Sequence, residues 1–457
     1  MSQPAPGRLL DILGLGFGLA GAVGGTIGAG ILRTPGLVAA QLPSPALVLA
    51  VWLAGGVYAL LGAVCIAELA AALPQAGGWY VYAERAFGRQ VGFLVGWTDW
   101  LAHCIGLAWV ATTVGDYSLA LLPADLLPAG MPLEGSISKG LALLAIGLFS
   151  LIQLRGLRAG STSQELLSLA KAVAFLALVA ACFLLPIPTA APIAPLSAEP
   201  MATLGWRNLS LAVVLALQAV ITTYDGWASP VYFAEEFSEP GRDLPRSLIG
   251  GVLAVLVLYL LINLALLHVL PIAQLASSSL PAAAAAQALA GPLGGLLITA
   301  IALVSLLGLI NTVVMAAPRI LFGLSRDGLL PSAVAAVNGG GTPAAALLIT
   351  STAAAALVLA GSFERLLAMG AVLYVSLPLA GIAALLALRR QEPNLPRPFR
   401  AWGYPLSPLL VAAVSLAFLV GTALGDWVDS LAALVLVALG YAASRLAAGP
   451  AGAEEPG

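Results

Sequence analysis

The chain has 457 residues, of which 60% are hydrophobic and only 9% are charged, and its formal net charge is −2. Soluble domains carry about 25% charged residues, so this composition excludes a soluble fold and indicates a polytopic protein whose partner is the lipid bilayer. The scattered arginines form no basic run, which argues against a nucleic-acid partner.

Apolar segments of about 18 or more residues predict twelve membrane spans and an all-α polytopic membrane protein. The spans lie near residues 10–41, 45–73, 91–122, 139–155, 163–186, 209–237, 247–270, 292–325, 343–361, 366–388, 406–424 and 428–446. Most arginines then fall on the side that holds both termini. The positive-inside rule predicts that this side is cytoplasmic.

The first span contains the most unusual stretch of the chain, GLGFGLAGAVGGTIGAGILRTPG at residues 14–36. Each glycine inside a helix costs about 1 kcal/mol relative to alanine, and four glycines cluster here. We therefore predict half-helices at about Leu10–Gly24 and Gly30–Gln41, with unwound backbone at Gly25–Ala29. The positive dipole end of the second half-helix suits a carboxylate, and the free carbonyls of the first suit an ammonium, so the break complements an amino-acid zwitterion.

The sixth span contains a second interruption, TTYDGWASP. An acidic residue, a glycine and a proline disfavour a membrane helix, so we predict a half-helix to about Tyr224, a break at Asp225–Ser229 and a second half to about Phe237. The two breaks are five spans apart. Interrupted helices at matching places in two halves indicate an inverted-repeat transporter with a site near the bilayer midplane.

The pattern also predicts the domain organisation. A ten-helix core is expected at residues 1–390, with inverted repeats at about 10–186 and 209–388. Residues 391–457 would hold a cytoplasmic linker, helices eleven and twelve, and a C-terminal tail from Ala447.

Connections between the spans have distinct compositions. Pro74–Gly88 predicts a short interfacial helix. The segment 186–200 is a proline-rich outer loop, 271–291 an outer loop with a short helix, and 393–404 a stiff basic linker.

Four motifs occur in a fixed order along the chain. They are VGGTIGAGI at 23–31, PQAGGWYVYAERAFG at 74–88, YDGW with AEE and EPGRDLPRSL between 224 and 248, and PRILFGLSRDGLLP at 318–331. In these motifs the chain resembles the amino acid–polyamine–organocation superfamily of transporters, and within it the neutral amino-acid exchangers and permeases. The resemblance implies the LeuT-like fold, a 5+5 inverted repeat with broken helices 1 and 6, in a bacterial inner membrane. It also implies alternating-access transport of small neutral L-amino acids, with no cofactor and no obligatory protein partner.

The resemblance assigns the substrate site to the two breaks. The substrate carboxylate would lie on the backbone N–H groups of Ala29 and Gly30, and the ammonium near carbonyls at Thr26, Thr222 and Asp225. The full expected set is Gly25, Thr26, Ile27, Gly28, Ala29, Gly30, Thr222, Tyr224, Asp225, Gly226 and Trp227.

Several of these side chains allow two interpretations. Tyr224 and Trp227 either form a gate or wall over the substrate or pack against spans one and three. Asp225 either binds a cationic substrate side chain or, as we favour, caps the N–H groups of the second half-helix.

Lys171 lies about eight residues into the fifth span, roughly 12 Å along the helix. A lysine at the centre of a span costs roughly 2.5–3.5 kcal/mol, so it is expected to be paired or functional. Sodium-coupled members of the resembled fold place sodium between spans one, five and eight, and relatives with a lysine in span five place its ammonium there. Lys171 fits that pattern and implies sodium-independent transport, with Ser305, Asn311 or Thr312 as the contact from span eight. If burial disfavours its charged form, Lys171 would also release a proton during the transport cycle. The alternative is an ammonium satisfied by any nearby carbonyl, with no role in transport.

The other charged residues of the spans each allow a functional and a purely structural interpretation. Glu235 and Glu236 with Arg319 and Arg326 form either a cytoplasmic ion-pair gate or a solvated interfacial cluster. Asp99 and His103 share one helix face, which suggests a proton relay or, as we favour, a buried hydrogen-bonded pair with no role in transport. Glu68 is expected at the membrane interface.

Alternative functions remain at this point. Within transport, the alternatives are exchange, proton-linked symport, and uptake of cationic amino acids or polyamines. A channel or a non-transporting sensor would be a different class, although a channel would carry a continuous polar stripe. No catalytic Ser/His/Asp set, phosphate loop or metal cluster stands out, so neither an enzyme nor a metal site is expected.

Overall fold

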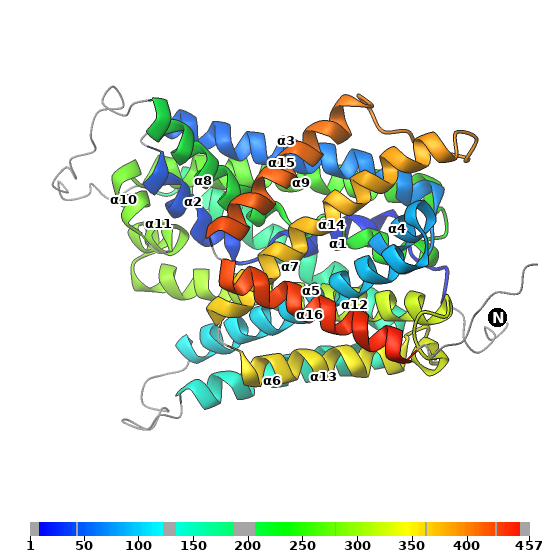
Figure 1. Ribbon diagram of the computed structural model, residues 1–457. Helices are drawn as coiled ribbons and strands as arrows, with labels where there is room; N and C mark the ends of the chain where they lie inside the picture. Colours follow the sequence, from blue (N-terminus) through cyan, green and yellow to red (C-terminus); the bar gives the residue numbers. More distant parts are fainter. Residues whose placement is uncertain are drawn as a thin grey trace, which may run out of the picture.

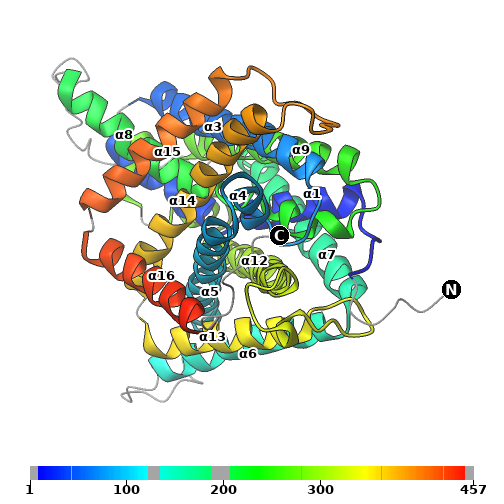
Figure 2. The same cartoon turned by 45° about the vertical axis from the view of Figure 1, so that its right-hand side comes forward.

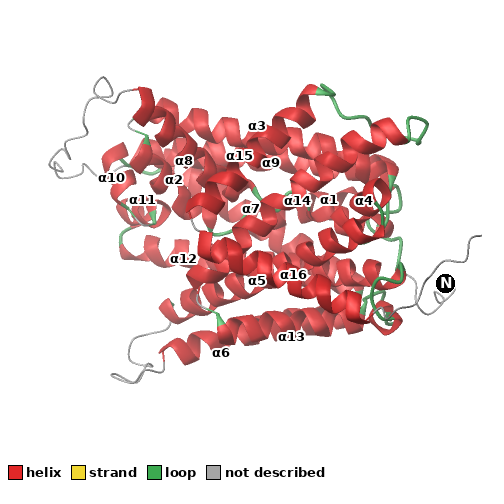
Figure 3. Ribbon diagram, in the orientation of Figure 1, coloured by secondary structure: helices red, strands yellow, loops and turns green. Residues whose placement is uncertain are grey.

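The computed structural model describes residues 9–42, 44–121, 134–186, 206–278, 280–361, 363–425 and 427–447. Within these ranges every regular element is an α-helix or a 3₁₀-helix (Figures 1 and 3). The predicted all-α class is confirmed. The proline-rich loop after Pro186 and the tail after Ala447 lie outside the described residues.

The long helices follow the predicted spans closely. Their bounds are α1 Leu15–Thr26, α2 Gly30–Gln41, α3 Pro45–Ala72, α5 Arg89–Ala120, α6 Glu134–Leu154, α7 Leu157–Leu184, α8 Trp206–Tyr224, α9 Pro240–Val269, α12 Pro292–Arg326, α13 Ala344–Ala360, α14 Phe363–Gln391, α15 Leu406–Gly425 and α16 Trp427–Ala447. Nine spans of the described residues, one of them α8 with the 3₁₀-helix that follows it, are long and apolar enough to cross a membrane, and the bent pair α1–α2 makes a tenth. The shorter apolar helices α13 and α16 occupy the places of predicted spans nine and twelve.

Proline marks the start of several helices. Pro45, Pro240, Pro281 and Pro292 each stand in the first turn of a helix. The missing N–H of proline costs nothing there, because the first turn has no intrahelical acceptor for it.

Burial separates central from peripheral helices. The apolar window of α5 is 72% buried, and that of α15 is 22% buried. In Figure 2, α5 accordingly runs through the middle of the helix assembly beside α12 and α4, whereas α15 lies on its outside.

The break in the first span is shorter than predicted. Helix α1 continues through Thr26, and α2 starts at Gly30 with a bend of 47° between them. The start of the span also differs, because α1 begins at Leu15 rather than near Leu10. Before α1 the backbone is tied to another segment, since Leu13 N–H donates to the Glu236 carbonyl at 2.8 Å.

The second half of the sixth span is a 3₁₀-helix and not the expected continuation as an α-helix. Helix α8 ends at Tyr224, as predicted, and η3 covers Ser229–Glu236. A 3₁₀-helix rises about 2.0 Å per residue, so its eight residues span about 16 Å, where an α-helix would span about 12 Å. The tighter helix therefore carries this short segment further.

Two predicted connecting helices are present. Helix α4 (Trp79–Phe87) falls within the predicted interfacial segment, but Trp79 and Tyr82 are buried, so the helix packs into the protein instead of resting on the interface. The segment 271–291 holds two short helices, α10 (Ile272–Ser277) and α11 (Pro281–Ala290).

Glu68 is fully buried, which corrects the expectation of an interfacial residue. Its carboxylate accepts from Arg389 at 2.7 and 2.5 Å, lies 3.0 Å from Arg397 Nε, and accepts from the backbone N–H of Ala401 at 2.7 Å. Two arginines and a backbone donor compensate the buried charge. The cluster attaches the linker after α14 to α3, and Arg85 pairs with Glu392 of the same linker.

We predict that Glu68→Gln lowers the apparent melting temperature of the purified protein by several degrees. Removing one partner of a buried ion pair costs about 3–5 kcal/mol, because the other charges stay buried. Glu392→Gln is the matched control: its partner Arg85 is exposed, and the hydrogen bonds from Arg85 hold the pKa of Glu392 below its usual value at the surface. Equal melting temperatures for the two variants would contradict the prediction.

Candidate functional site

The start of α2 offers unused backbone donors. No side chain of the described residues caps its N-terminus, where Gly30 begins the helix. Leu32 N–H bonds the Ala29 carbonyl at 3.1 Å, which closes only part of the first turn. An uncapped helix N-terminus is a favourable place for an anionic group.

The carbonyl side of the break is held by Lys171. Its ammonium donates to the carbonyls of Gly24 at 2.7 Å and Ile27 at 3.0 Å, and the side chain is fully buried in α7. From α12 the neighbour is Gly308, because a Cβ built there would lie 2.8 Å from Lys171 Cε and 3.0 Å from Nζ. The ammonium therefore lies between α1, α7 and α12.

The three expected partners from span eight do not bond Lys171. Asn311 bonds Gln153 and Gln164, each at 2.8 Å, and Thr312 bonds the Gly308 carbonyl at 3.0 Å. Ser305 Oγ is buried with no partner among the described residues. The close approach of Gly308 was missed, because a glycine gives no sequence signal for what packs against it.

Two further side chains of α7 hold α1. Ser168 donates to the Ala20 carbonyl at 2.8 Å, and Gln164 donates to the same carbonyl at 3.3 Å. Spacings of four and three residues put Gln164, Ser168 and Lys171 on one helix face. This spacing is the sequence signal for the shared face.

The two breaks touch through their backbones. Gly226 has φ +101°, and a Cβ there would lie 2.2 Å from the Gly25 carbonyl oxygen. A Cβ on Gly25 would lie 2.3 Å from Ser229 Oγ. Only glycine fits at both positions. We call this contact between Gly25 and Gly226 the crossing. Tyr259 of α9 connects the two spans beside it, because its hydroxyl lies 3.1 Å from the Thr26 carbonyl and 3.2 Å from the Thr223 carbonyl.

Gly28 and Gly30 lie beside the crossing with different surroundings. A Cβ on Gly30 would meet Thr223 Cγ2 at 3.3 Å, and one on Gly28 would make ordinary contact with Leu309 at 3.6 Å. A side chain on Gly30 would therefore enter α8, not open space.

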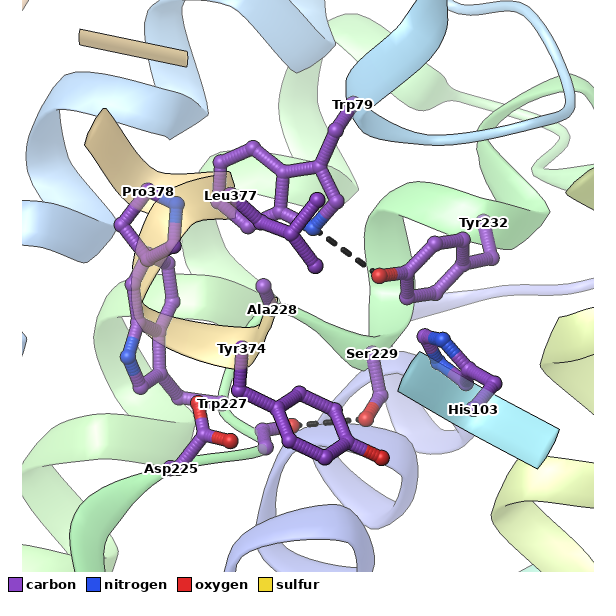
Figure 4. A pocket seen from close by; sticks show the side chains of 11 residues that line it. Trp79, His103, Asp225, Trp227, Ala228, Ser229, Tyr232, Tyr374, Leu377 and Pro378 are labelled. Atoms are coloured by element: carbon purple, nitrogen blue, oxygen red, sulfur yellow. Dashed lines mark hydrogen bonds between the residues drawn. The ribbon is translucent and has the colours of Figure 1, made fainter. Parts of the chain in front are cut away.

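A cavity of about 50 Å³ lies beside the second break, enough for a few water molecules (Figure 4). Its walls come from α4, α5, the second break and α14. The lining residues are Trp79, His103, Asp225, Gly226, Trp227, Ala228, Ser229, Tyr232, Tyr374, Leu377 and Pro378.

The structure separates the residues expected at the second break. Asp225 and Trp227 line the cavity, whereas Thr222 bonds the Gln218 carbonyl and Tyr224 packs against Trp52. The N-cap residue of η3 is Ala228, which has no capping side chain, and the favoured capping role of Asp225 stays a prediction.

Trp227 serves as both wall and packing residue. It is 5% exposed, and its ring meets Trp79 edge to face at a centroid distance of 6.3 Å. A Cβ on Gly62 of α3 would lie 3.1 Å from the Trp227 ring. The ring therefore fills the space between α3, α4 and the cavity.

A chain of polar side chains runs from the cavity into α5. Trp79 Nε1 donates to Tyr232 Oη at 2.9 Å, and Tyr232 donates to Asp99 Oδ1 at 3.0 Å (Figure 4 shows the first of these bonds). Asp99 also lies 3.1 Å from His103 Nδ1. The expected buried pair is thus present, and its histidine lines the cavity.

The acidic residues at the end of η3 pair with α12. Arg319 forms a bidentate pair with Glu236, and both side chains are buried. Arg326 pairs with Glu235 where both are about 30% exposed. The arrangement is an ion-pair cluster with a buried half, so the solvated-cluster interpretation fails for Glu236.

Comparisons with known proteins agree with this architecture. An amino acid permease family model matches residues 12–438. The serine/threonine exchanger SteT of Bacillus subtilis (strain 168) is 30% identical over 325 residues, covering 70% of this chain and 69% of that protein. The human large neutral amino acids transporter small subunit 2 is 27% identical over 400 residues, covering 87% and 73%. The chloroplastic cationic amino acid transporter 9 of Arabidopsis thaliana is 30% identical over 348 residues, covering 72% and 57%. The chain belongs to the amino acid permease family of the amino acid–polyamine–organocation superfamily, and is an amino acid transporter of the membrane.

Proposed function

We propose that this transporter carries small neutral L-amino acids by alternating access and without sodium. The observation that carries the proposal is the broken first span, in which Lys171 holds the carbonyls of Gly24 and Ile27 while the N-terminus of α2 is left uncapped. An ammonium at the carbonyl end supplies the positive charge that a bound cation would otherwise bring there.

The uncapped donors at Ala29 and Gly30 are the proposed subsite for the substrate carboxylate. Since Lys171 and Tyr259 occupy carbonyls of the first break, the proposed place for the substrate ammonium is the turn at Asp225–Ala228. The proposed side-chain subsite is the cavity beside Trp227.

The proposal includes a membrane arrangement. Twelve spans in a five-plus-five inverted repeat, with residues 1–390 as the transport core, are supported by breaks at the first and sixth spans. We propose a bacterial inner membrane with both termini cytoplasmic. The arginine-rich linker supports that side as the cytoplasmic one.

One observation favours a second candidate function, the transport of cationic amino acids. Asp225 is exposed at the second break and lines the cavity, where its carboxylate would suit a cationic side chain. Two of the relatives named above also differ in this respect, since one is named for serine and threonine and another for cationic amino acids.

A thermal-shift screen of the purified protein against the twenty common L-amino acids separates these candidates. An amino acid at 100 times its dissociation constant stabilises its binding state by about 2.7 kcal/mol. We expect small neutral amino acids to raise the apparent melting temperature, and lysine and arginine to leave it unchanged. Radiolabelled counterflow in liposomes then excludes a channel, and a response to lysine alone would select the second candidate.

Sodium independence depends on Lys171. We expect the parent protein in liposomes to exchange its amino acid at equal rates in sodium and choline buffers. Lys171→Ala should lose at least tenfold in rate, because two buried carbonyls lose their donor. Lys139→Ala is the control, since this other lysine is only partly buried and donates to the Leu359 carbonyl. A parent that requires sodium would overturn the assignment.

Trp227 is the residue proposed to close the side-chain subsite. We expect Trp227→Ala to raise the apparent KM several-fold while the protein still purifies as a folded monodisperse species, because the ring borders the cavity. The control is Trp427→Ala, at a position that is 66% exposed. Parental kinetics in Trp227→Ala would leave the ring with a packing role alone.

A further inference from the structure

The carboxylate of Asp99 is buried in an incomplete set of hydrogen bonds. The residue is fully buried in α5, and its Oδ1 receives His103 Nδ1 at 3.1 Å and Tyr232 Oη at 3.0 Å. Its Oδ2 is also buried and has no partner among the described residues. A bare carboxylate oxygen in the membrane interior is costly unless a proton or a cation neutralises the charge.

The hydrogen bonds of His103 fix which nitrogen can exchange a proton. Nδ1 lies 2.9 Å from the backbone carbonyl of Asp99 and 3.1 Å from its carboxylate, and both partners are acceptors. Nδ1 therefore carries a hydrogen, and Nε2 is the nitrogen that gains or loses one. No described residue bonds Nε2, and the ring lines the cavity.

The titratable groups around the pair come from four elements. Tyr232 of η3 and Tyr374 of α14 meet the His103 ring at centroid distances of 4.9 and 6.1 Å. Asp225 of the second break lies across the same cavity (Figure 4). Cys104 is the adjacent residue of α5 itself.

The other helices against α5 bring no free cation to this place. Helix α13 has no titratable residue, and the arginines of α12 pair with Glu235 and Glu236. Four of the remaining charged or titratable side chains with described surroundings are engaged elsewhere: Tyr80 with Asp327, Arg85 with Glu392, Lys139 with the Leu359 carbonyl, and Arg389 with Glu68. Arg390 is exposed in the last turn of α14 and does not line the cavity. Glu84, Tyr82, Asp429 and Tyr441 bring no positive charge. The Asp225 carboxylate and the His103 imidazole thus line the cavity, and the Asp99 carboxylate lies behind the imidazole. No arginine or lysine of the described residues lines this cavity.

We propose that Asp99 and His103 form a proton-binding site that couples amino-acid transport to the movement of one proton. The proposal rests on the proposed transport function. In the proton-loaded state, a proton from cavity water binds His103 Nε2, and the imidazolium then forms a neutral ion pair with the Asp99 carboxylate. In the unloaded state, the same proton has returned to water on the other side and leaves neutral histidine beside the carboxylate. No other co-reactant is needed.

The geometry connects this site to the moving parts. Tyr232, which bonds Asp99, belongs to η3 and follows the substrate turn directly. Trp79, which bonds Tyr232, also packs on Trp227. A rearrangement of η3 around substrate therefore removes or restores a donor on Asp99 and admits water, and both changes alter the free energy of the charged pair.

The experiment uses the full-length protein in liposomes with the pH dye pyranine inside. Each of the twenty common L-amino acids is supplied outside, with valinomycin and equal potassium to hold the membrane potential at zero. With the lumen one pH unit more alkaline, coupling to one proton allows up to about tenfold accumulation over the outside concentration. We expect the parent to accumulate its amino acid and to acidify the lumen, and His103→Gln and Asp99→Asn to show no gradient-driven accumulation at any exchange rate.

The chain supplies a matched control, because its other histidine, His268, lies at the outer end of α9 against Phe183. His268→Gln should keep the parental accumulation and dye signal. Tyr232→Phe, which removes one donor from Asp99, should shift the pH dependence of accumulation without abolishing it. The proton site would be overturned by a parent that shows counterflow but gives no dye signal in the pH-gradient experiment. Gradient-driven accumulation in His103→Gln, or lysine accumulation without proton entry, would overturn it as well. A parent without counterflow would overturn the proposed function itself, and the proton site with it.

Discussion

In lipid, every backbone N–H and C=O that a helix break releases must find a partner inside the protein. The rest of this structure depends on how that requirement is met. Lys171 holds two carbonyls of the first break, and Tyr259 reaches one carbonyl from each break. Helices α7 and α9 therefore stabilise the interrupted spans, while no side chain of the described residues caps the donors at the start of α2.

The breaks could be predicted from local sequence chemistry, whereas the contacts that depend on long-range packing could not. Clustered glycines, and Asp225 with Pro230, disfavour a membrane helix wherever they stand, so both breaks and the end of α8 were predicted to within a few residues. The partners Gly308 and Tyr259 could not be predicted, since nothing near them in sequence indicates which carbonyl they meet. Glu68 was placed wrongly for the same reason, because its arginines are more than 300 residues away.

Buried charge is treated differently in two parts of the protein. Glu68 and Glu236 each have arginine partners with bidentate geometry, so their charges are compensated within the protein. Asp99 and Asp225 have no such partner in the described residues around the cavity. The first arrangement fixes segments in place, and the second leaves a negative potential that attracts a mobile positive charge.

The contact of Gly25 with Gly226 gives the two interrupted spans a shared contact point about which each would rotate. Because the backbones touch there without side chains between them, neither segment can tilt without moving the other. Helix α1 runs ten residues from Gly25 back to Leu15, about 15 Å, so a tilt of about 10° displaces its far end by about 3 Å. A small rotation at this contact is therefore larger at the far end of α1, and it requires no unwinding of the helix.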